Sequence, residues 1–313
     1  MTKTWHRPTL WLAAVMAVLA LGTAIGLLVD DRVLQGSPLW LKPFKFSVSL
    51  AIYSVTLSWM LSLPHRGRRI TTALATLVVG IMAVEIAFIV ASTWHGAFTH
   101  FNQSEDALNN ALQFAFGFVM VMFAANIVLA LVFTFQRAVD RPTMWAVRTG
   151  TWLAIAGMGI AYLMIFQFDQ GTMATDAAGR TVELSSGHSV GVPDGGPGMP
   201  ITGWSTMGGD LRVPHFVGLH GLQVMVLLLF GLTALKLTDR AKLRLVFIAA
   251  ASYAGFLALL TWQALRGEPL VHPGFTTLAV AAGIAVATAA ATVRVVKTGK
   301  AVPLPDRRPA LQR

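Results

Sequence analysis

Long apolar runs constrain this chain more than any other feature. A helix needs about 20 mostly apolar residues to cross the hydrocarbon core of a bilayer, and the sequence contains eight runs of about that length. Soluble domains carry about 25% charged residues, whereas only 12% of these 313 residues are charged. The sequence therefore predicts an all-α fold, a polytopic membrane helix bundle of eight transmembrane helices. We place the spans at about 9–29, 45–63, 71–94, 108–136, 147–168, 213–236, 244–264 and 274–296.

The connections between these runs alternate in charge. One set, which includes both ends of the chain, holds 18 of the 24 Lys and Arg residues, and the other set holds 10 of the 14 acidic residues. The basic set comprises 1–7, 65–69, 137–148, 236–244 and 294–313. Because basic connections stay on the cytoplasmic side, we expect both termini inside and the protein in a cell membrane, namely the bacterial cytoplasmic membrane. The net charge of +10 then reflects topology and attraction to the lipid bilayer, not nucleic-acid binding.

The apolar runs and their connections also predict the domain organisation. We treat residues 1–300 as one eight-helix transmembrane domain and 301–313 as a cytoplasmic tail. The first run is longer than the 7–15 residues of a signal-peptide core, which predicts an uncleaved first span. The outer connection 169–213 is rich in Gly and Pro, and its middle, AAGRTVELSSGHSVG, predicts a short β-hairpin. Because long connections are often functional, we expect a lid over the outer face.

Ionisable side chains gather near the outer ends of the predicted spans. Six of the eight histidines fall there: His95, His100, His188, His215, His220 and His272. Ionisable residues inside a span are energetically expensive and are functional candidates, which applies to His215 and His220, and to Glu85 in the middle of the third span. His188 and His272 stand among loop glycines and prolines, so we expect them to be interfacial side chains without a special role.

The stretch DLRVPHFVGLHGLQ opens the sixth span with unusually polar residues. His215 and His220 are separated by about 140° around a regular helix, so they cannot chelate one ion by themselves. A shared site needs partners from another helix, and His95 and His100 follow the third span. The absence of cysteine excludes disulfides, thiolate metal sites, iron–sulfur clusters and cysteine nucleophiles.

Histidines between helices can hold haem axially, and haem propionates need cations nearby. We therefore predict a redox or ligand-binding site for haem b or for a transition metal, Zn, Cu or Fe, with a small molecule or an electron-transfer protein as partner. The predicted metal ligands are His95, His100, His215 and His220. The residues predicted to bind the cofactor are Lys42, Lys45, Asn102, Arg212 and Gln223. In architecture alone the chain resembles the haem A synthases, but it lacks their cysteine pair and their Glu-x-x-His-Arg stretches.

Three other functions stay open at this point. A zinc-dependent membrane hydrolase would use Glu85 or Asp210 as its catalytic base. A proton-coupled solute transporter would use Glu85 inside the membrane, although the sequence shows no internal repeat and no pair of broken helices of the kind that marks many carriers. A non-catalytic scaffold subunit would tolerate changes at all the outer polar residues.

Overall fold

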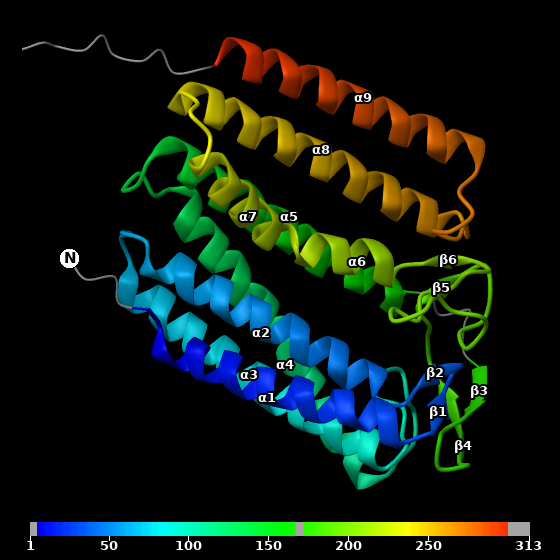
Figure 1. Ribbon diagram of the computed structural model, residues 1–313. Helices are drawn as coiled ribbons and strands as arrows, with labels where there is room; N and C mark the ends of the chain where they lie inside the picture. The colour runs from blue at the N-terminus through cyan, green and yellow to red at the C-terminus, as the bar shows by residue number, and fades with distance from the viewer. Residues whose placement is uncertain (1–4, 167–171, 300–313) are drawn as a thin grey trace, which may run out of the picture.

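The computed structural model describes residues 5–166 and 172–299 and is mostly helical, with 68% helix. Figure 1 shows the helices as long, roughly aligned rods. The nine helices in the described residues are α1 Arg7–Val29, α2 Leu41–Ser62, α3 Arg68–Trp94, α4 Ala107–Thr134, α5 Arg141–Ile165, α6 Arg212–Leu219, α7 Gly221–Thr233, α8 Asp239–Leu265 and α9 Phe275–Thr298. The predicted tail, 301–313, lies outside the described residues.

Within that part of the chain, six helices are long and apolar enough to cross a membrane, namely α1, α2, α3, α4, α8 and α9. The pair α6 and α7 makes a seventh if it is taken as one span, bent by 44° at a break. The eight predicted spans are thus not confirmed. The predicted span without a counterpart among them is the fifth, at about 147–168, which corresponds to α5, a helix that contains Arg141 and Arg148. Several long apolar helices are compatible with a multi-pass membrane protein.

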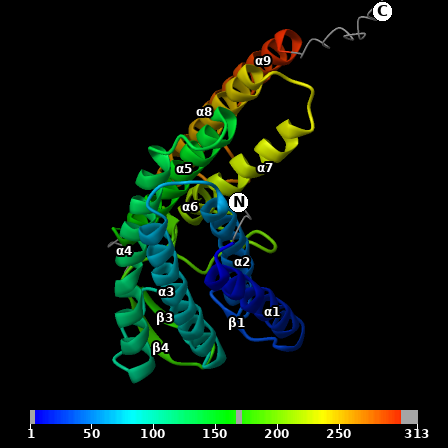
Figure 2. The same cartoon turned by 90° about the vertical axis from the view of Figure 1, so that its left-hand side faces the viewer.

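The helices form two groups that lie side by side (Figures 1 and 2). In the first, α1 packs on α2 and α3 packs on α4, and in the second α5 packs against α6, α7 and α8. A Cβ atom on Gly157 of α5 or on Gly218 of α6 would collide with the backbone of the other helix, so these glycines permit a very close approach. At the edge of the second group, α9 lies along α8.

The two groups are joined mainly at one end of the molecule. Leu61 near the end of α2 shares a buried cluster with Val226 of α7. Next to it, the rings of Trp59 and Phe230 meet edge-on with centroids 5.9 Å apart. These contacts lie in the C-terminal part of α2, so they leave its N-terminal end free to approach other elements.

That opposite end, which we call the loop side, carries the strands (Figure 1). They are β1 Val33–Leu34, β2 Ser37–Pro38, β3 Thr172–Thr175, β4 Thr181–Leu184, β5 Ser189–Val190 and β6 Gly209–Asp210, paired antiparallel as β1–β2, β3–β4 and β5–β6. The predicted hairpin is present but was placed too far along the chain. Its turn forms at Asp176–Gly179, where Gly179 has φ +81°, because glycine adopts this left-handed conformation without strain.

Candidate functional site

Titratable side chains converge at the loop side, where α2 begins, α3 ends and α6 begins. They lie close enough to influence one another's charge. We call them the loop-side cluster: Lys42, Lys45, His100, His188, Asp194, Asp210, Arg212 and His215. The cluster unites residues from α2, from the α3–α4 turn, from the connection after α5 and from α6, so most of its pairs are far apart in the sequence.

The two lysines of α2 are half-buried, and neither forms an ion pair with a carboxylate of the described residues. The Lys42 ammonium group contacts the Thr99 hydroxyl and lies 2.6 Å from His100 Nδ1. The Lys45 ammonium group donates to the Thr202 carbonyl at 2.5 Å. Among the described residues, neither ammonium group has a carboxylate within 4.0 Å. A partly buried cation without a directly paired counter-ion is energetically unfavourable, so this part of the cluster is suited to receive an anion.

The position of the lysines on α2 strengthens this property. Both stand in the first turns of the helix, and the N-cap residue, Trp40, makes no side-chain capping hydrogen bond. The first N–H groups of a helix have no intrahelical acceptor, and the helix dipole places partial positive charge there. Cations at this end oppose the dipole, whereas an anion would satisfy both the dipole and the lysines.

Arg212 and Asp210 form a closed pair at the start of α6. Arg212 Nη2 lies 2.6 Å from Asp210 Oδ2, and Arg212 Nε donates to Asp210 Oδ1 at 2.9 Å. The same carboxylate accepts the main-chain N–H groups of Arg212 and Ser205, and Arg212 Nη2 also donates to the Gly203 carbonyl. This network anchors the long connection to α6. It gives Asp210 a structural role, while its predicted role as a catalytic base stays a prediction.

His188 and Asp194 form a second pair, in the connection itself. His188 Nδ1 lies 2.8 Å from Asp194 Oδ2, and the carboxylate also accepts the main-chain N–H groups of His188 and Ser189 at 2.9 Å. Burial opposes ionisation of Asp194, but the hydrogen bonds and charge of His188 outweigh it and hold the Asp194 pKa below its usual range. Burial lowers the His188 pKa more than the hydrogen bond to Asp194 raises it.

This pair was not predicted from the sequence. His188 was expected to be a loop histidine without a special role, yet it is 19% exposed and faces Phe101 with ring centroids 5.2 Å apart. The six-residue spacing between His188 and Asp194 in a Gly- and Pro-rich segment was the available signal. It is weak, because nothing in a loop sequence shows that the loop folds back over helix ends.

Two of the predicted metal ligands lie in the cluster, and each has one ring nitrogen engaged. His100 Nδ1 is near Lys42, and its ring lies 4.5 Å from that of Phe116. Burial, followed by the charges of Lys42, His188 and His215, holds the His100 pKa well below its usual value. His215 Nδ1 donates to the Gly157 carbonyl of α5 at 2.7 Å, which identifies Nδ1 as the protonated nitrogen in that bond.

The break between α6 and α7 carries the other two residues of the predicted sixth-span site. His220 stands between the helices, and its buried Nε2 has no hydrogen-bond partner. With its amide nitrogen turned toward the end of α6, Gln223 donates to the carbonyls of Leu219 and His220 at 3.2 Å. Gln223 thus satisfies the main chain at the break. The sequence predicted no pair of broken helices, and the described residues contain one bent helix pair, α6 and α7, where Gly157 and Gly218 bring α6 close to α5.

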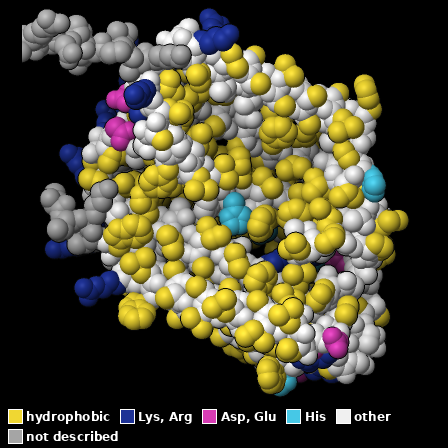
Figure 3. All heavy atoms as spheres, in the orientation of Figure 1, with side chains coloured by type: hydrophobic (Ala, Val, Ile, Leu, Met, Phe, Trp, Pro, Cys, Tyr) yellow, Lys and Arg dark blue, Asp and Glu magenta, His cyan; other side chains and the backbone are white. Residues whose placement is uncertain are grey.

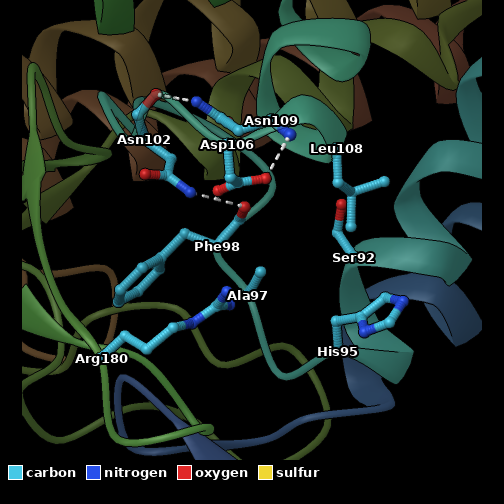
Figure 4. A pocket seen from close by; sticks show the side chains of 9 residues that line it. All are labelled: Ser92, His95, Ala97, Phe98, Asn102, Asp106, Leu108, Asn109 and Arg180. Carbon is cyan, nitrogen blue, oxygen red and sulfur yellow. Dashed lines mark hydrogen bonds between the residues drawn. The ribbon is translucent and has the colours of Figure 1, made fainter.

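His95 and Asn102 lie in a separate pocket between the end of α3 and the start of α4 (Figure 4). The cavity measures about 190 Å³, with His95 and Arg180 on opposite sides of it in Figure 4. Asp106 closes it from the N-cap of α4, where its side chain accepts the Asn109 N–H at 2.9 Å. The full lining is Ser92, His95, Ala97, Phe98, Asn102, Asp106, Leu108, Asn109 and Arg180.

The two polar residues predicted in this region differ in environment. His95 is exposed at the end of α3. Asn102 is 3% exposed, and its side-chain oxygen accepts the N–H of Ser104 at 2.9 Å while its carbonyl accepts from the Asn109 side chain. Asn102 therefore organises the turn into α4. The predicted pairing of His95 with the histidines of the sixth span has no support in this arrangement.

Glu85 lies neither in the loop-side cluster nor in the pocket between α3 and α4. It lies in the middle of α3, about 15 Å along the helix from His95 by the usual helical rise. Its Oε1 is buried without a hydrogen-bond partner. The structure thus leaves Glu85 as an isolated acid in an apolar helix.

No metal centre emerges from these residues. Within the described part of the chain, no group of three or more His, Asp or Glu side chains is arranged to hold a metal ion. The four predicted histidine ligands are instead divided among the cluster, the break in the sixth span and the pocket beside α4.

Comparisons with known proteins add no relative. No protein-family model, no curated protein and no solved structure matches this chain.

Proposed function

We propose that this protein binds a small anionic group, a phosphate or a carboxylate, at its loop-side cluster. The observation that carries the proposal is the pair of half-buried ammonium groups of Lys42 and Lys45, which have no carboxylate of the described residues within 4.0 Å. Arg212 lies near enough to affect the charge of both lysines. Its own charge is met by Asp210, whereas Asp194 and Asp210 act on the lysines only from beyond ion-pair distance, so an anion could pair with the lysines directly.

We also propose a membrane topology for the protein, which sets the side on which this site lies. We count eight spans, with α5 as one and the α6–α7 pair as another, which puts both termini inside and the loop side outside the cell. The charge distribution of the connections supports this orientation. The less apolar α5 is supported as a span by its contacts with α7 and α8, because a helix surrounded by other helices needs less apolar surface.

A proton-coupled transporter is the second candidate, and two observations favour it. The α6–α7 pair is bent by 44° at a break, and broken helices often form substrate sites in carriers. Glu85 places an unpartnered carboxyl oxygen inside α3, and such groups often serve in proton relays. In this candidate function the loop-side cluster is the anion site and Glu85 carries the coupled proton.

The haem and metal hypotheses receive less support. The cations that would meet haem propionates do lie together, but the histidines proposed as ligands do not form one group. The absorbance spectrum and metal content of the purified protein decide between these hypotheses and simple anion binding. The zinc-hydrolase and scaffold hypotheses gain no observation in their favour.

Titration of the full-length protein in detergent with inorganic phosphate tests anion binding. We expect Lys45→Gln to weaken binding by about tenfold, since a hydrogen bond to a charged group contributes about 1.5–3 kcal/mol and each 1.4 kcal/mol is tenfold. Lys236→Gln is the matched control, because Lys236 is exposed at the opposite end of the molecule. Equal phosphate affinity in the wild type and in Lys45→Gln would refute the proposal.

A further inference from the structure

The loop-side cluster has an apolar neighbour that opens sideways from the helix bundle. The bend between α6 and α7 gives these two helices different partners. α7 contacts α2 through Trp59 and Phe230, whereas α6 packs on α5 and α8, held by Gly157 and Gly218. As a result α2 and the α6–α7 pair approach each other at the end remote from the loop side and separate toward it. Figure 3 shows this face hollowed in that region, with a histidine and a cationic side chain visible inside the hollow.

A row of three rings follows α6 from the cluster toward the bend. Trp204 and Phe216 meet with ring centroids 5.8 Å apart, and Phe216 and His220 meet at 4.4 Å. Phe216 is 40% exposed, so the row presents apolar surface. Thr202, which accepts from Lys45, lies two residues before Trp204. The rings therefore connect the lysine end of the cluster to the middle of the broken helix.

The surroundings of the hollow favour lipid over water. On either side stand α2 and the α6–α7 pair, which are candidate membrane spans. Both expose apolar side chains, including Ile52 of α2 and Leu227 of α7, the latter 68% exposed. A groove between two spans is open to hydrocarbon, so its occupant needs an apolar chain. The two lysines at one end require that the same occupant carry an anionic head.

We propose that the anion bound at the loop-side cluster is the phosphate head of an anionic membrane phospholipid, whose acyl chain lies in the groove along Trp204, Phe216 and His220. This inference rests on the proposed function. The phosphate neutralises Lys42 and Lys45 at the first turn of α2, and the acyl chain packs on the exposed face of Phe216.

The test compares three probes on the full-length protein in a nonionic detergent: dioleoylphosphatidylglycerol, dioleoylphosphatidylcholine and inorganic phosphate. We expect phosphatidylglycerol to bind more tightly than either of the others. Phe216→Ala should weaken phosphatidylglycerol by about tenfold, because it removes the buried apolar area of one ring, and should leave phosphate affinity unchanged. Phe275→Ala is the matched control, since Phe275 is 87% exposed on α9.

The outcomes separate this inference from the proposed function. If phosphatidylglycerol binds no more tightly than phosphate or phosphatidylcholine, or if Phe216→Ala leaves its affinity intact, the groove is not a lipid site although the anion site stands. If the affinity of no anionic probe depends on Lys45, both proposals fail.

A second experiment covers the case in which the Phe216 variant folds poorly. Phosphatidylglycerol with brominated acyl chains should quench tryptophan fluorescence in the wild type, and Trp204→Phe should reduce that quenching. Unchanged quenching in Trp204→Phe counts against the groove.

Discussion

Two loop-side regions of this molecule contain the same residue types but in different states of charge balance. In the pocket beside α4, Arg180 is paired with Asp176 at 2.7 Å and is 49% exposed, and Asp106 is engaged as a helix cap. In the loop-side cluster, Lys42 and Lys45 are half-buried and contact only neutral groups among the described residues. The charged groups of the pocket thus have partners within the protein, whereas the two lysines of the cluster have no directly paired carboxylate among the described residues.

The difference shows what distinguishes a binding site from a polar surface. A paired and exposed cation gains little from a ligand, because water and its partner already stabilise it. A partly buried cation without a directly paired counter-ion gains the most, since the surrounding medium has a low dielectric constant. On this reasoning we propose the cluster, rather than the pocket, as the functional site, whereas the residues of the pocket hold the α3–α4 turn.

The largest expected effect comes from reversing one charge in each region. Lys42→Glu should lower the affinity for inorganic phosphate by about a hundredfold, because it removes a cation and supplies Lys45 with an internal counter-ion. Arg180→Glu should change that affinity by less than about twofold. Titration calorimetry of both variants measures this. Comparable losses in the two variants would show that the comparison between the regions is wrong.

The second expected effect is a dependence of stability on pH that arises in the cluster. The folded-state pKa of His188 lies below the ordinary histidine value of 6.5, and that of Asp194 lies below the ordinary aspartate value of 3.8. Between the folded-state and unfolded-state pKa of each group, the unfolded chain binds more protons than the folded protein, so the free energy of unfolding decreases as pH falls. The contribution of His188 is lost below about pH 6.5, and that of Asp194 below about pH 4.

Thermal unfolding in detergent at pH 7 and pH 5 measures the first of these steps. His188→Gln should reduce the fall in melting temperature, because it removes one titrating group. A residual fall is expected from His100, whose pKa is also lowered. The charged and titratable groups around His188 are Asp194, Arg212, Lys42, His100 and His215. His272→Gln, at an exposed histidine, should leave the fall unchanged, and an equal effect of the two variants would contradict the assignment.

The smallest effect is expected in the pocket. Asp106→Ala should lower stability by about 1 kcal/mol, the usual contribution of an N-cap side chain, and should leave phosphate affinity unchanged. Asp106→Ser keeps a capping oxygen and should restore most of the loss. A melting curve and a phosphate titration on each variant are sufficient. Weaker phosphate binding in Asp106→Ala would extend the site into the pocket.

Several elements of the fold could be predicted from the sequence because they depend on local composition. The bounds of α1, α3 and α9 lie within three residues of the predicted ones. The break at His220 was missed, since an apolar run that continues through α7 hides it. The hairpin was shifted because its turn depends on one glycine, Gly179, among several in the same connection.

The candidate site was predicted only in part. Lys42, Lys45 and Arg212 stood out because cations are unusual at the outer ends of spans, and the structure brings them close together. His188 did not, because its partner Asp194 lies in a loop with no periodic pattern. His95 was grouped with His100 from their closeness in the sequence, but the turn directs it to another pocket.

The sequence by itself determined that the chain forms long apolar helices and that cations and histidines stand near their ends, because both properties follow from the order of residue types. Only the tertiary structure decided which of these charges are paired. Pairing depends on how the connection after α5 folds over the start of α2 and on how far α6 leans toward α5, and these are set by contacts between residues far apart in the chain, such as Gly157 with Gly218 and Lys45 with Thr202.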